Sequence, residues 1–335
     1  MRGMCPWRRV GSWILALAAA LAAAACGDSP TSPSPPPPQL TLTCPASQTV
    51  VSSSGQPVSV TWEAPASQGG TPPIQTTCTP ASGSAFPVGT ATVGCIATST
   101  AAGQTATCAF TVTVARPPQL SVTRFMAFGD SITWGTASAP AGFLAYPIPA
   151  PSYSYPNQLQ LTLTANYPGQ TFAVANEGWP GEMLADGLAR LPSALTANAP
   201  EVILLLHGAN DLLNYPSDAT VQYISDRLGQ MVRVCKARVA APNRVMLATF
   251  PPQFVGDPVN RGSGWAFVPG LNQKIGAVAQ SEGATLVDLY TPMNADVKRY
   301  IGRDGLQPTE AGFTLMAQTF AAVIQEKFEV KPTAR

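Results

Sequence analysis

The pattern of apolar residues changes once along the chain, close to Arg116-Pro117-Pro118. Before this point, short runs that alternate apolar and polar residues are separated by Gly, Pro and Ser, a pattern typical of antiparallel strands. After it, strand-like apolar runs alternate with stretches of helical apolar spacing, which is typical of a parallel sheet covered by helices. The 335 residues are enough for two cores. We therefore predict an all-β sandwich over residues 40–115 and an α/β domain over residues 120–330.

The pattern also indicates where the main elements lie. In the first domain we expect strands at residues 40–43, 57–62, 92–98 and 107–114. In the second we expect strands at residues 125–128, 172–175, 202–206, 245–250 and 285–289, and a last helix from about Pro308 to Phe328.

The first 25 residues have the composition of an export signal. Arg2, Arg8 and Arg9 give a positive start, an apolar run over residues 13–25 follows, and small residues lead to Cys26. The apolar run is too short to cross a bilayer comfortably as a helix. We therefore expect residues 1–25 to be a signal peptide, which places the protein outside the cytoplasm.

Residues 23–27, Ala-Ala-Ala-Cys-Gly, resemble a bacterial lipobox. The resemblance implies a lipid on Cys26 and an anchor in the cell envelope. Ala23 stands where leucine is usual, so cleavage without a lipid, giving a secreted protein, is the alternative. Residues 26–39 are rich in Pro, Ser and Thr, which favours extended polyproline II and predicts a tether.

Composition limits the partners and cofactors. The formal net charge is +1 and only 11% of residues are charged, so the chain lacks the basic excess of nucleic-acid-binding proteins, and we expect no nucleic acid partner. One histidine and scattered carboxylates offer no metal-ligand spacing. No glycine-rich phosphate loop is present. We therefore expect neither a metal nor a cofactor.

Cysteine usage agrees with export. Cys44, Cys78, Cys95 and Cys108 crowd into the predicted β-domain, where disulfides are the expected reason, and four cysteines allow three pairings. Cys235 stands alone in a helical pattern and is expected to be a buried free thiol.

Four segments of the β-domain carry a further signal, at residues 78–84, 86–90, 93–95 and 108–114. Together they resemble the HYR (hyalin repeat) module, an immunoglobulin-like domain. The resemblance implies extracellular adhesion or spacing. Because the segment contains no titratable cluster that could support chemistry, we expect it to act as a spacer.

In the α/β domain, polar residues cluster just after the predicted strands, where ligands bind in parallel sheets. The four clusters are Gly129-Asp130-Ser131-Ile132-Thr133, Asn176-Glu177-Gly178-Trp179-Pro180-Gly181, Gly208-Ala209-Asn210-Asp211 and Asp304-Gly305-Leu306-Gln307. Each alone predicts only a turn or a helix cap. Their order and spacing together resemble the four blocks of the SGNH (GDSL-type) hydrolase superfamily.

That resemblance implies a flavodoxin-like, three-layer domain that hydrolyses esters. It assigns the nucleophile to Ser131 and the oxyanion donors to the backbone N–H groups of Ser131 and Gly181 and the side-chain amide of Asn210. Acyl transfer needs such a nucleophile and such donors. Asp130 is expected to order the nucleophile loop through hydrogen bonds. The implied substrate is a small acyl ester or an O-acetylated carbohydrate.

The fourth block departs from the family pattern. The family has Asp-x-x-His, in which the aspartate orients a histidine that takes the serine proton; here Asp304 is present, but Gln307 stands in place of the histidine. An amide takes no proton near neutral pH. His207, the only histidine of the chain, follows a predicted strand and is the candidate substitute base.

Two functions from different classes follow. The first is an exported serine ester hydrolase, with turnover put in doubt by Gln307. The second is a surface binding protein that keeps the hydrolase scaffold but is catalytically silent.

Overall fold

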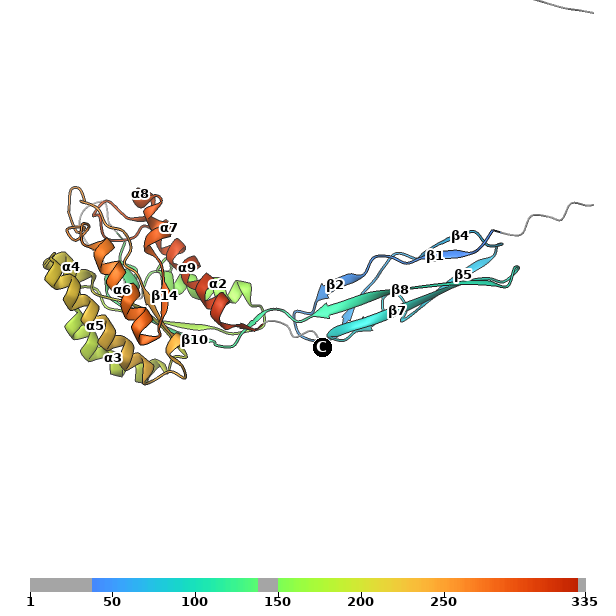
Figure 1. The fold of residues 1–335 in the computed structure, drawn as a ribbon, viewed down its shortest axis with the longest axis horizontal. Coiled ribbons are helices and arrows are strands. Elements are labelled where there is room, and N and C mark those ends of the chain that lie inside the picture. The colour runs from blue at the N-terminus through green and yellow to red at the C-terminus, as the bar shows by residue number, and fades with distance from the viewer. Residues whose placement is uncertain (1–37, 138–149, 331–335) are drawn as a thin grey trace, which may run out of the picture.

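The computed structural model describes residues 38–137 and 150–330. The expected signal peptide, Cys26 and most of the expected tether lie outside the described residues. Two separate hydrophobic cores are present, one in the N-terminal part and a larger one in the C-terminal part. Figure 1 shows them as a long, narrow β-domain beside a wider domain of helices and strands.

The β-domain is built around a four-stranded sheet in the order β2-β8-β7-β5, flanked by the pairs β1-β4 and β3-β6. The strands are β1 (Thr41–Thr43), β2 (Gln48–Val51), β3 (Val58–Ser59), β4 (Ala66–Gln68), β5 (Ile74–Thr79), β6 (Ala85–Phe86), β7 (Gly89–Ser99) and β8 (Gln104–Ala115). The expected strands at residues 92–98 and 107–114 are confirmed within β7 and β8, which pair along their whole length.

The expected strand at residues 57–62 is shorter than predicted. Only Val58 and Ser59 pair as a strand. Val60 is buried in the core, and its N–H donates to Ser84 O in an irregular segment. The apolar alternation therefore predicts correctly that this segment is buried, but not which of its residues pair as a strand. The polar strand β5 has no alternation of its own and was not predicted.

All four cysteines of the β-domain form disulfides, as expected, and the structure decides the pairing: Cys44 with Cys108 and Cys78 with Cys95. The two bonds lie side by side, since one sulfur atom each of Cys44, Cys95 and Cys108 lies within 4.8 Å of the others. In the described part of the chain this is the one group with metal-ligand spacing, and disulfide sulfurs are not thiolate ligands.

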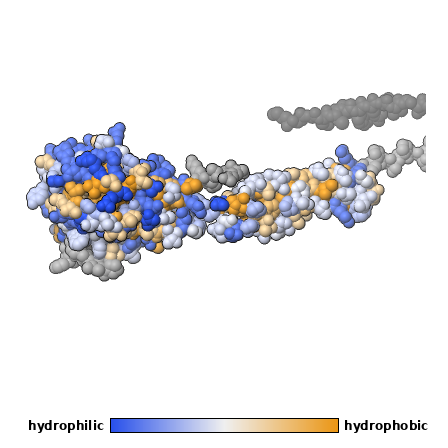
Figure 2. Space-filling view, turned by 90° about the horizontal axis from the view of Figure 1, so that it is seen from below, coloured by the Kyte–Doolittle hydropathy of each residue, from blue (hydrophilic) through white to orange (hydrophobic). Residues whose placement is uncertain are grey.

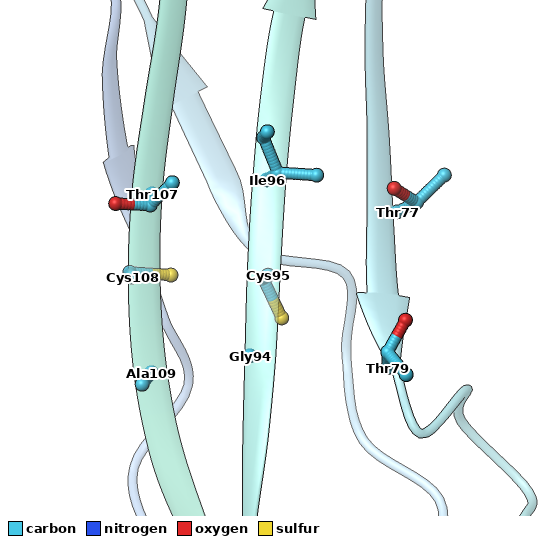
Figure 3. Close-up of a pocket in the computed structure, with 8 residues that line it drawn as sticks. All are labelled: Thr77, Thr79, Gly94, Cys95, Ile96, Thr107, Cys108 and Ala109. Atoms are coloured by element: carbon cyan, nitrogen blue, oxygen red, sulfur yellow. The ribbon is translucent and has the colours of Figure 1, made fainter.

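The outer face of this sheet has a shallow hollow near the disulfides. Figure 3 shows its lining across three strands: Thr107, Cys108 and Ala109 come from β8, Gly94, Cys95 and Ile96 from β7, and Thr77 and Thr79 from β5. The hollow forms because Gly94 and Ala109, which are cross-strand partners, have almost no side chain. No charged residue lines it, so the hollow has no group that could do acid–base chemistry.

The C-terminal domain has a parallel five-stranded sheet in the order β11-β10-β12-β13-β14. The strands are β10 (Arg124–Gly129), β11 (Ala173–Gly178), β12 (Val202–Leu206), β13 (Val245–Ala248) and β14 (Thr285–Val287). Numbered along the chain, this order is 2-1-3-4-5, which is flavodoxin-like. Ligands in such sheets bind where the first and third strands meet, here at the carboxyl ends of β10 and β12.

Helices cover both faces of the sheet. The long helices are α2 (Tyr155–Asn166), α3 (Leu184–Asn198), α5 (Asp218–Lys236), α6 (Val268–Glu282) and α9 (Glu310–Phe328). Helices α3, α5 and α6 pack in series on one face, and α2 packs against α9 on the other (Figure 1). The expected three-layer architecture is confirmed.

Short elements complete the domain. They are α1 (Ser131–Trp134), α4 (Ala209–Asn214), η1 (Pro242–Arg244), α7 (Tyr290–Asn294), α8 (Val297–Tyr300) and the two-stranded pair of β9 (Gln119–Leu120) with β15 (Glu329–Val330). The pair β9-β15 ties the start of the domain to its last helix.

Element boundaries match the predictions closely at β10 and β12, whereas β13 and β14 each end two residues before the predicted bound and β11 extends three residues beyond it. Strand β12 has the predicted bounds because every residue in it is apolar and buried. Helix α9 begins after Thr309, whose hydroxyl accepts the Gly312 N–H at 3.1 Å as a helix cap. Strand β11 extends through the polar residues Asn176 to Gly178, because they pair with the end of β10.

Cys235 is a buried free thiol, as predicted. Burial raises its pKa to about 12. It therefore stays protonated near neutral pH and is no nucleophile.

The described surface mixes hydrophobic and hydrophilic residues, as the face in Figure 2 shows for both domains. None of the described helices combines the length and the apolar character that a membrane crossing requires.

Candidate active site

Ser131 lies at the carboxyl end of β10, as the first residue of helix α1. The close approach of neighbouring strands requires Gly129 just before it, because a Cβ there would lie 2.0 Å from the Leu206 carbonyl oxygen. Ser131 is itself only 3% exposed. The strand, turn and helix thus hold its hydroxyl at the edge of the sheet where ligands of such folds bind.

Asp130 ties two loops of the site together. Its Oδ1 accepts the Ile132 N–H at 3.1 Å, and its Oδ2 accepts the N–H groups of Gly208 at 3.2 Å and Ala209 at 3.0 Å. These bonds join the turn after β10 to the turn after β12. The predicted role of Asp130 in ordering the nucleophile loop through hydrogen bonds agrees with this geometry.

Gln307 contacts the Ser131 hydroxyl directly. Gln307 Nε2 lies 3.0 Å from Ser131 Oγ and donates to it, although the two residues are 176 positions apart in the sequence. Gln307 is only 2% exposed, and its Oε1 is buried with no hydrogen-bond partner among the residues that the structure describes. The side chain therefore occupies the place next to the serine that the family resemblance assigns to a base.

Asp304 shapes the turn that carries Gln307. Its Oδ1 accepts the backbone N–H groups of Leu306 and Gln307, both at 3.0 Å. The Gln307 carbonyl in turn accepts the Gly302 N–H at 2.8 Å. The Gly305 carbonyl accepts the Phe254 N–H at 3.1 Å, which braces the turn from outside. The position of Gln307 is therefore set by backbone bonds on both sides.

The three predicted oxyanion donors keep free N–H groups. Across the two described stretches of the chain, no residue accepts a hydrogen bond from the backbone N–H of Ser131 or Gly181. Gly181 has φ +82°, which suits glycine alone. Asn210 Nδ2 donates to Glu182 O at 2.9 Å, and since an amide nitrogen has two hydrogens, one N–H remains for a ligand.

His207 lies near the site but is not joined to Ser131 by a hydrogen bond. Its Nε2 lies 2.9 Å from Glu182 Oε2, and its Nδ1 lies 3.9 Å from Asp130 Oδ2. The His207 side chain is completely buried. A histidine held in this way interacts with carboxylates behind the site, which gives the idea of a substitute base no geometric support.

Glu182 and Arg190 were missed by sequence reasoning. Arg190 donates from Nε and Nη2 to the two Glu182 carboxylate oxygens at 2.8 and 2.9 Å, and from Nη1 to Glu177 at 3.0 Å. Burial would raise the pKa of Glu182, but the bonds from Arg190 and His207 outweigh burial and lower it. The only sequence signal was that Glu182 directly follows Gly181.

The pKa of Asp211, next to Asn210, shifts in the opposite direction to that of Glu182. Burial raises the pKa of the Asp211 carboxyl, only partly offset by the hydrogen bond that Oδ2 accepts from the Leu184 N–H at 2.9 Å. The Asp211 carboxyl therefore accepts a backbone N–H at the start of α3, although burial destabilises its charged form.

Comparison with known proteins agrees with the geometry. Residues 35–114 match the HYR domain model, which confirms the predicted resemblance of the β-domain. The chain is 27% identical to the esterase TesA of Pseudomonas aeruginosa over 143 residues, which cover 43% of this chain and 65% of that esterase. The chain thus matches slightly less than two thirds of this relative.

A solved structure shows the same fold. The lipase/acylhydrolase from Enterococcus faecalis superposes with a TM-score of 0.51 at 23% identity, covering 64% of this chain and 100% of that one. Residues 127–315, more than half of the chain, match the model of the GDSL-like Lipase/Acylhydrolase family, and the protein therefore belongs to that family.

Proposed function

We propose that the C-terminal domain binds esters over Ser131 and hydrolyses them slowly, with Gln307 limiting the rate. The contact between Gln307 Nε2 and Ser131 Oγ at 3.0 Å supports this proposal most directly. It places an amide beside a buried serine hydroxyl in a site where each of the three proposed oxyanion donors keeps one free N–H. The site therefore keeps what stabilises a tetrahedral intermediate and lacks what removes the serine proton.

The proposed reaction has two steps. Ser131 Oγ attacks the ester carbonyl carbon, the oxyanion accepts hydrogen bonds from Ser131 N–H, Gly181 N–H and the second Asn210 N–H, and the alcohol leaves with a proton to give an acyl-serine. Water then attacks the acyl group and releases the acid and the free serine. Because Gln307 takes no proton, solvent must accept the serine proton. A serine hydrolase without its base keeps only about 10³–10⁴-fold catalysis over water.

The same contact favours a second function, silent ligand binding. Gln307 is fixed by backbone bonds and holds the hydroxyl as an acceptor, so the site could bind esters without forming a covalent adduct. The two functions differ in one observable, which is acylation of Ser131.

The proposed substrates are short acyl esters or O-acetylated carbohydrates. Trp179 precedes the proposed donor Gly181 by two residues and is 59% exposed. An exposed indole beside the reacting centre offers a flat apolar surface to a sugar ring or an acyl group. The name of the relative, an esterase, agrees with ester substrates.

We further propose that the protein is exported and held by a lipid on Cys26, or secreted if no lipid is attached. Two disulfides in the β-domain support an oxidising location. The proline-rich segment and the HYR domain would then hold the hydrolase domain away from the membrane as spacers.

Hydrolysis of p-nitrophenyl acetate and butyrate by the full chain tests this proposal. We expect slow turnover that disappears in Ser131→Ala and persists in Ser281→Ala, a matched control on the exposed end of α6. A fluorophosphonate should label Ser131 slowly and leave Ser131→Ala unlabelled. Ester binding without turnover or label would favour the silent binding protein instead.

A further inference from the structure

A buried charged cluster lies directly behind the proposed oxyanion donors. The Glu182 carboxylate accepts two hydrogen bonds from Arg190. Its Oε2 also lies 2.9 Å from His207 Nε2. The side chains of Glu182 and His207 are 6% and 0% exposed. The Arg190 guanidinium carbon also lies 4.2 Å from the centroid of the Phe128 ring, on the strand that leads to Ser131. Three segments of the fold therefore meet at one carboxylate.

The backbone of Glu182 connects this cluster to two of the proposed donors. The Glu182 N–H donates to Trp179 O at 3.2 Å, closing a turn with Pro180 and Gly181 at its centre. Proline followed by glycine with positive φ is the preferred pair for a type II turn. This turn sets the direction of the Gly181 N–H. The Glu182 carbonyl then accepts Asn210 Nδ2 at 2.9 Å, which sets the direction of the second amide N–H.

The charge of Glu182 matters for this arrangement. An ionised carboxylate accepts from Arg190 through both oxygens and from His207 through one of them. Glutamine has the same size but only one acceptor oxygen, and its NH₂ group would face N–H donors. Leaving the partly buried Arg190 without one of its carboxylate acceptors is costly, so the turn would have to shift.

We infer that Glu182 is a positioning residue, which aligns the Gly181 N–H and the Asn210 amide toward the oxyanion through its side-chain bonds to Arg190 and His207. The inference deepens the proposed function and rests on it. In this arrangement the one histidine of the chain serves the oxyanion donors rather than the serine proton.

Affinity for a boronic acid tests the inference without requiring turnover. A boronic acid adds to Ser131 Oγ as the serine proton passes to solvent. The resulting tetrahedral boronate anion places an oxygen where the oxyanion forms, whereas the carboxylate of butyrate, the product, is planar. We expect Glu182→Gln to weaken boronate binding by about 10–100-fold and butyrate binding by less than about threefold. The expected loss is smaller than the about 10²–10³-fold seen when an oxyanion donor is removed, because the donors are misaligned rather than removed. Parallel loss of both affinities would overturn the inference, because it would indicate general damage.

Glu201→Gln is the matched control. Glu201 is also a partly buried carboxylate, but it accepts the backbone N–H groups of Thr123 and Arg124 at the opposite end of the sheet. We expect it to leave boronate affinity unchanged. In the Gln307→His background, Glu182→Gln should lower kcat by about 10–100-fold with little change in KM, since the donors act on the transition state.

Spectra of the parent chain separate failure of this inference from failure of the proposed function. Glu182→Gln should move the NMR resonances of the Asn210 side-chain amide and the Gly181 backbone amide, and Glu201→Gln should not. Unchanged Asn210 resonances would overturn the positioning role. If no boronate binds the parent or Gln307→His, ester chemistry at Ser131 is rejected, and the Asn210 resonances alone decide whether Glu182 positions the amide.

Discussion

Gln307 Nε2 donates a hydrogen bond to Ser131 Oγ across 3.0 Å, within a site where both residues are almost completely buried. The bond leaves the serine hydroxyl positioned but not activated, since an amide offers no basic atom near neutral pH. The rest of the site has a nucleophile loop ordered by Asp130 and free N–H groups at the proposed oxyanion donors. Under the proposed function, this one residue, Gln307, limits the rate of ester hydrolysis.

Gln307→His should raise the rate of p-nitrophenyl acetate hydrolysis by about a thousandfold or more, because it supplies a general base beside Ser131. The rate should rise with pH through about 6.5, the ordinary histidine pKa, since only the neutral ring accepts the proton. Initial rates over a pH series measure both effects. Gln307→Asn, which keeps an amide, is the control; an equal gain in that variant, or a gain that survives Ser131→Ala, would contradict the assignment.

Gly187→Ala should disturb the contact between His207 and Glu182. An added Cβ at position 187 would lie 2.3 Å from His207 Nε2 and 3.1 Å from Glu182 Oε2. Glycine to alanine inside a helix ordinarily stabilises by about 0.5–1 kcal/mol, and here the clash should reverse the sign. Because the chain has one histidine, its ring signals in a ¹⁵N NMR spectrum report the change directly.

Gly276→Ala is the matched control for this substitution. Gly276 lies in α6, where an added Cβ would meet nothing closer than 3.8 Å. We expect its melting temperature, Tm, to be unchanged or higher and its histidine signals unaltered. Identical spectra for Gly187→Ala and the parent would show that the ring accommodates a methyl group and that the contact is loose.

Removing the disulfides should destabilise the β-domain unequally. In the chain-entropy model, a bond that closes a loop of 64 residues, Cys44 with Cys108, contributes about 4 kcal/mol, and one that closes 17, Cys78 with Cys95, about 3 kcal/mol. Paired Cys→Ser variants, followed by calorimetry, should lower the β-domain transition more for the first pair. The transition of the hydrolase domain should stay in place; a shift of both transitions would indicate that the domains unfold together.

Asp211→Asn should stabilise the hydrolase domain near neutral pH. A raised carboxyl pKa means that the folded state favours the protonated form, so the stability that this carboxyl contributes is present below its ordinary pKa and is lost as pH rises through the raised one. The neutral amide avoids that loss. The Tm gain over the parent should be clear at about pH 8 and shrink toward about pH 4.

Asp288→Asn should destabilise the hydrolase domain near neutral pH. Burial would raise the pKa of Asp288, but hydrogen bonds from Thr291 and Thr249 outweigh it and lower the pKa. Its contribution is therefore present above the ordinary pKa and lost as pH falls, so this variant should have a lower Tm at about pH 8 and approach the parent in acid. The same sign for both variants would contradict the account of these two carboxyls.

Much of the fold and the candidate site follows from the sequence alone. The five consecutive apolar residues of β12 are typical of a buried strand in a parallel sheet, and the cap at Thr309 sets the start of α9. Such features depend on neighbours a few residues apart, so periodicity and capping predict them. The Gly-Asp-Ser turn and the Asp304-to-Gln307 segment belong to the same class, because their backbone bonds are local.

Other features were decided only by the tertiary structure. Sequence could not choose among three disulfide pairings, could not show that His207 contacts Glu182 rather than Ser131, and gave Arg190 no role. The disulfide pairs and the His207 contact depend on which distant segments meet when the chain folds, which no local pattern encodes. The Arg190 contacts, 8 and 13 positions apart, depend on how α3 packs against the turn before it. The sequence determined which groups the site contains, and the packing of strands from distant parts of the chain determined which of those groups touch.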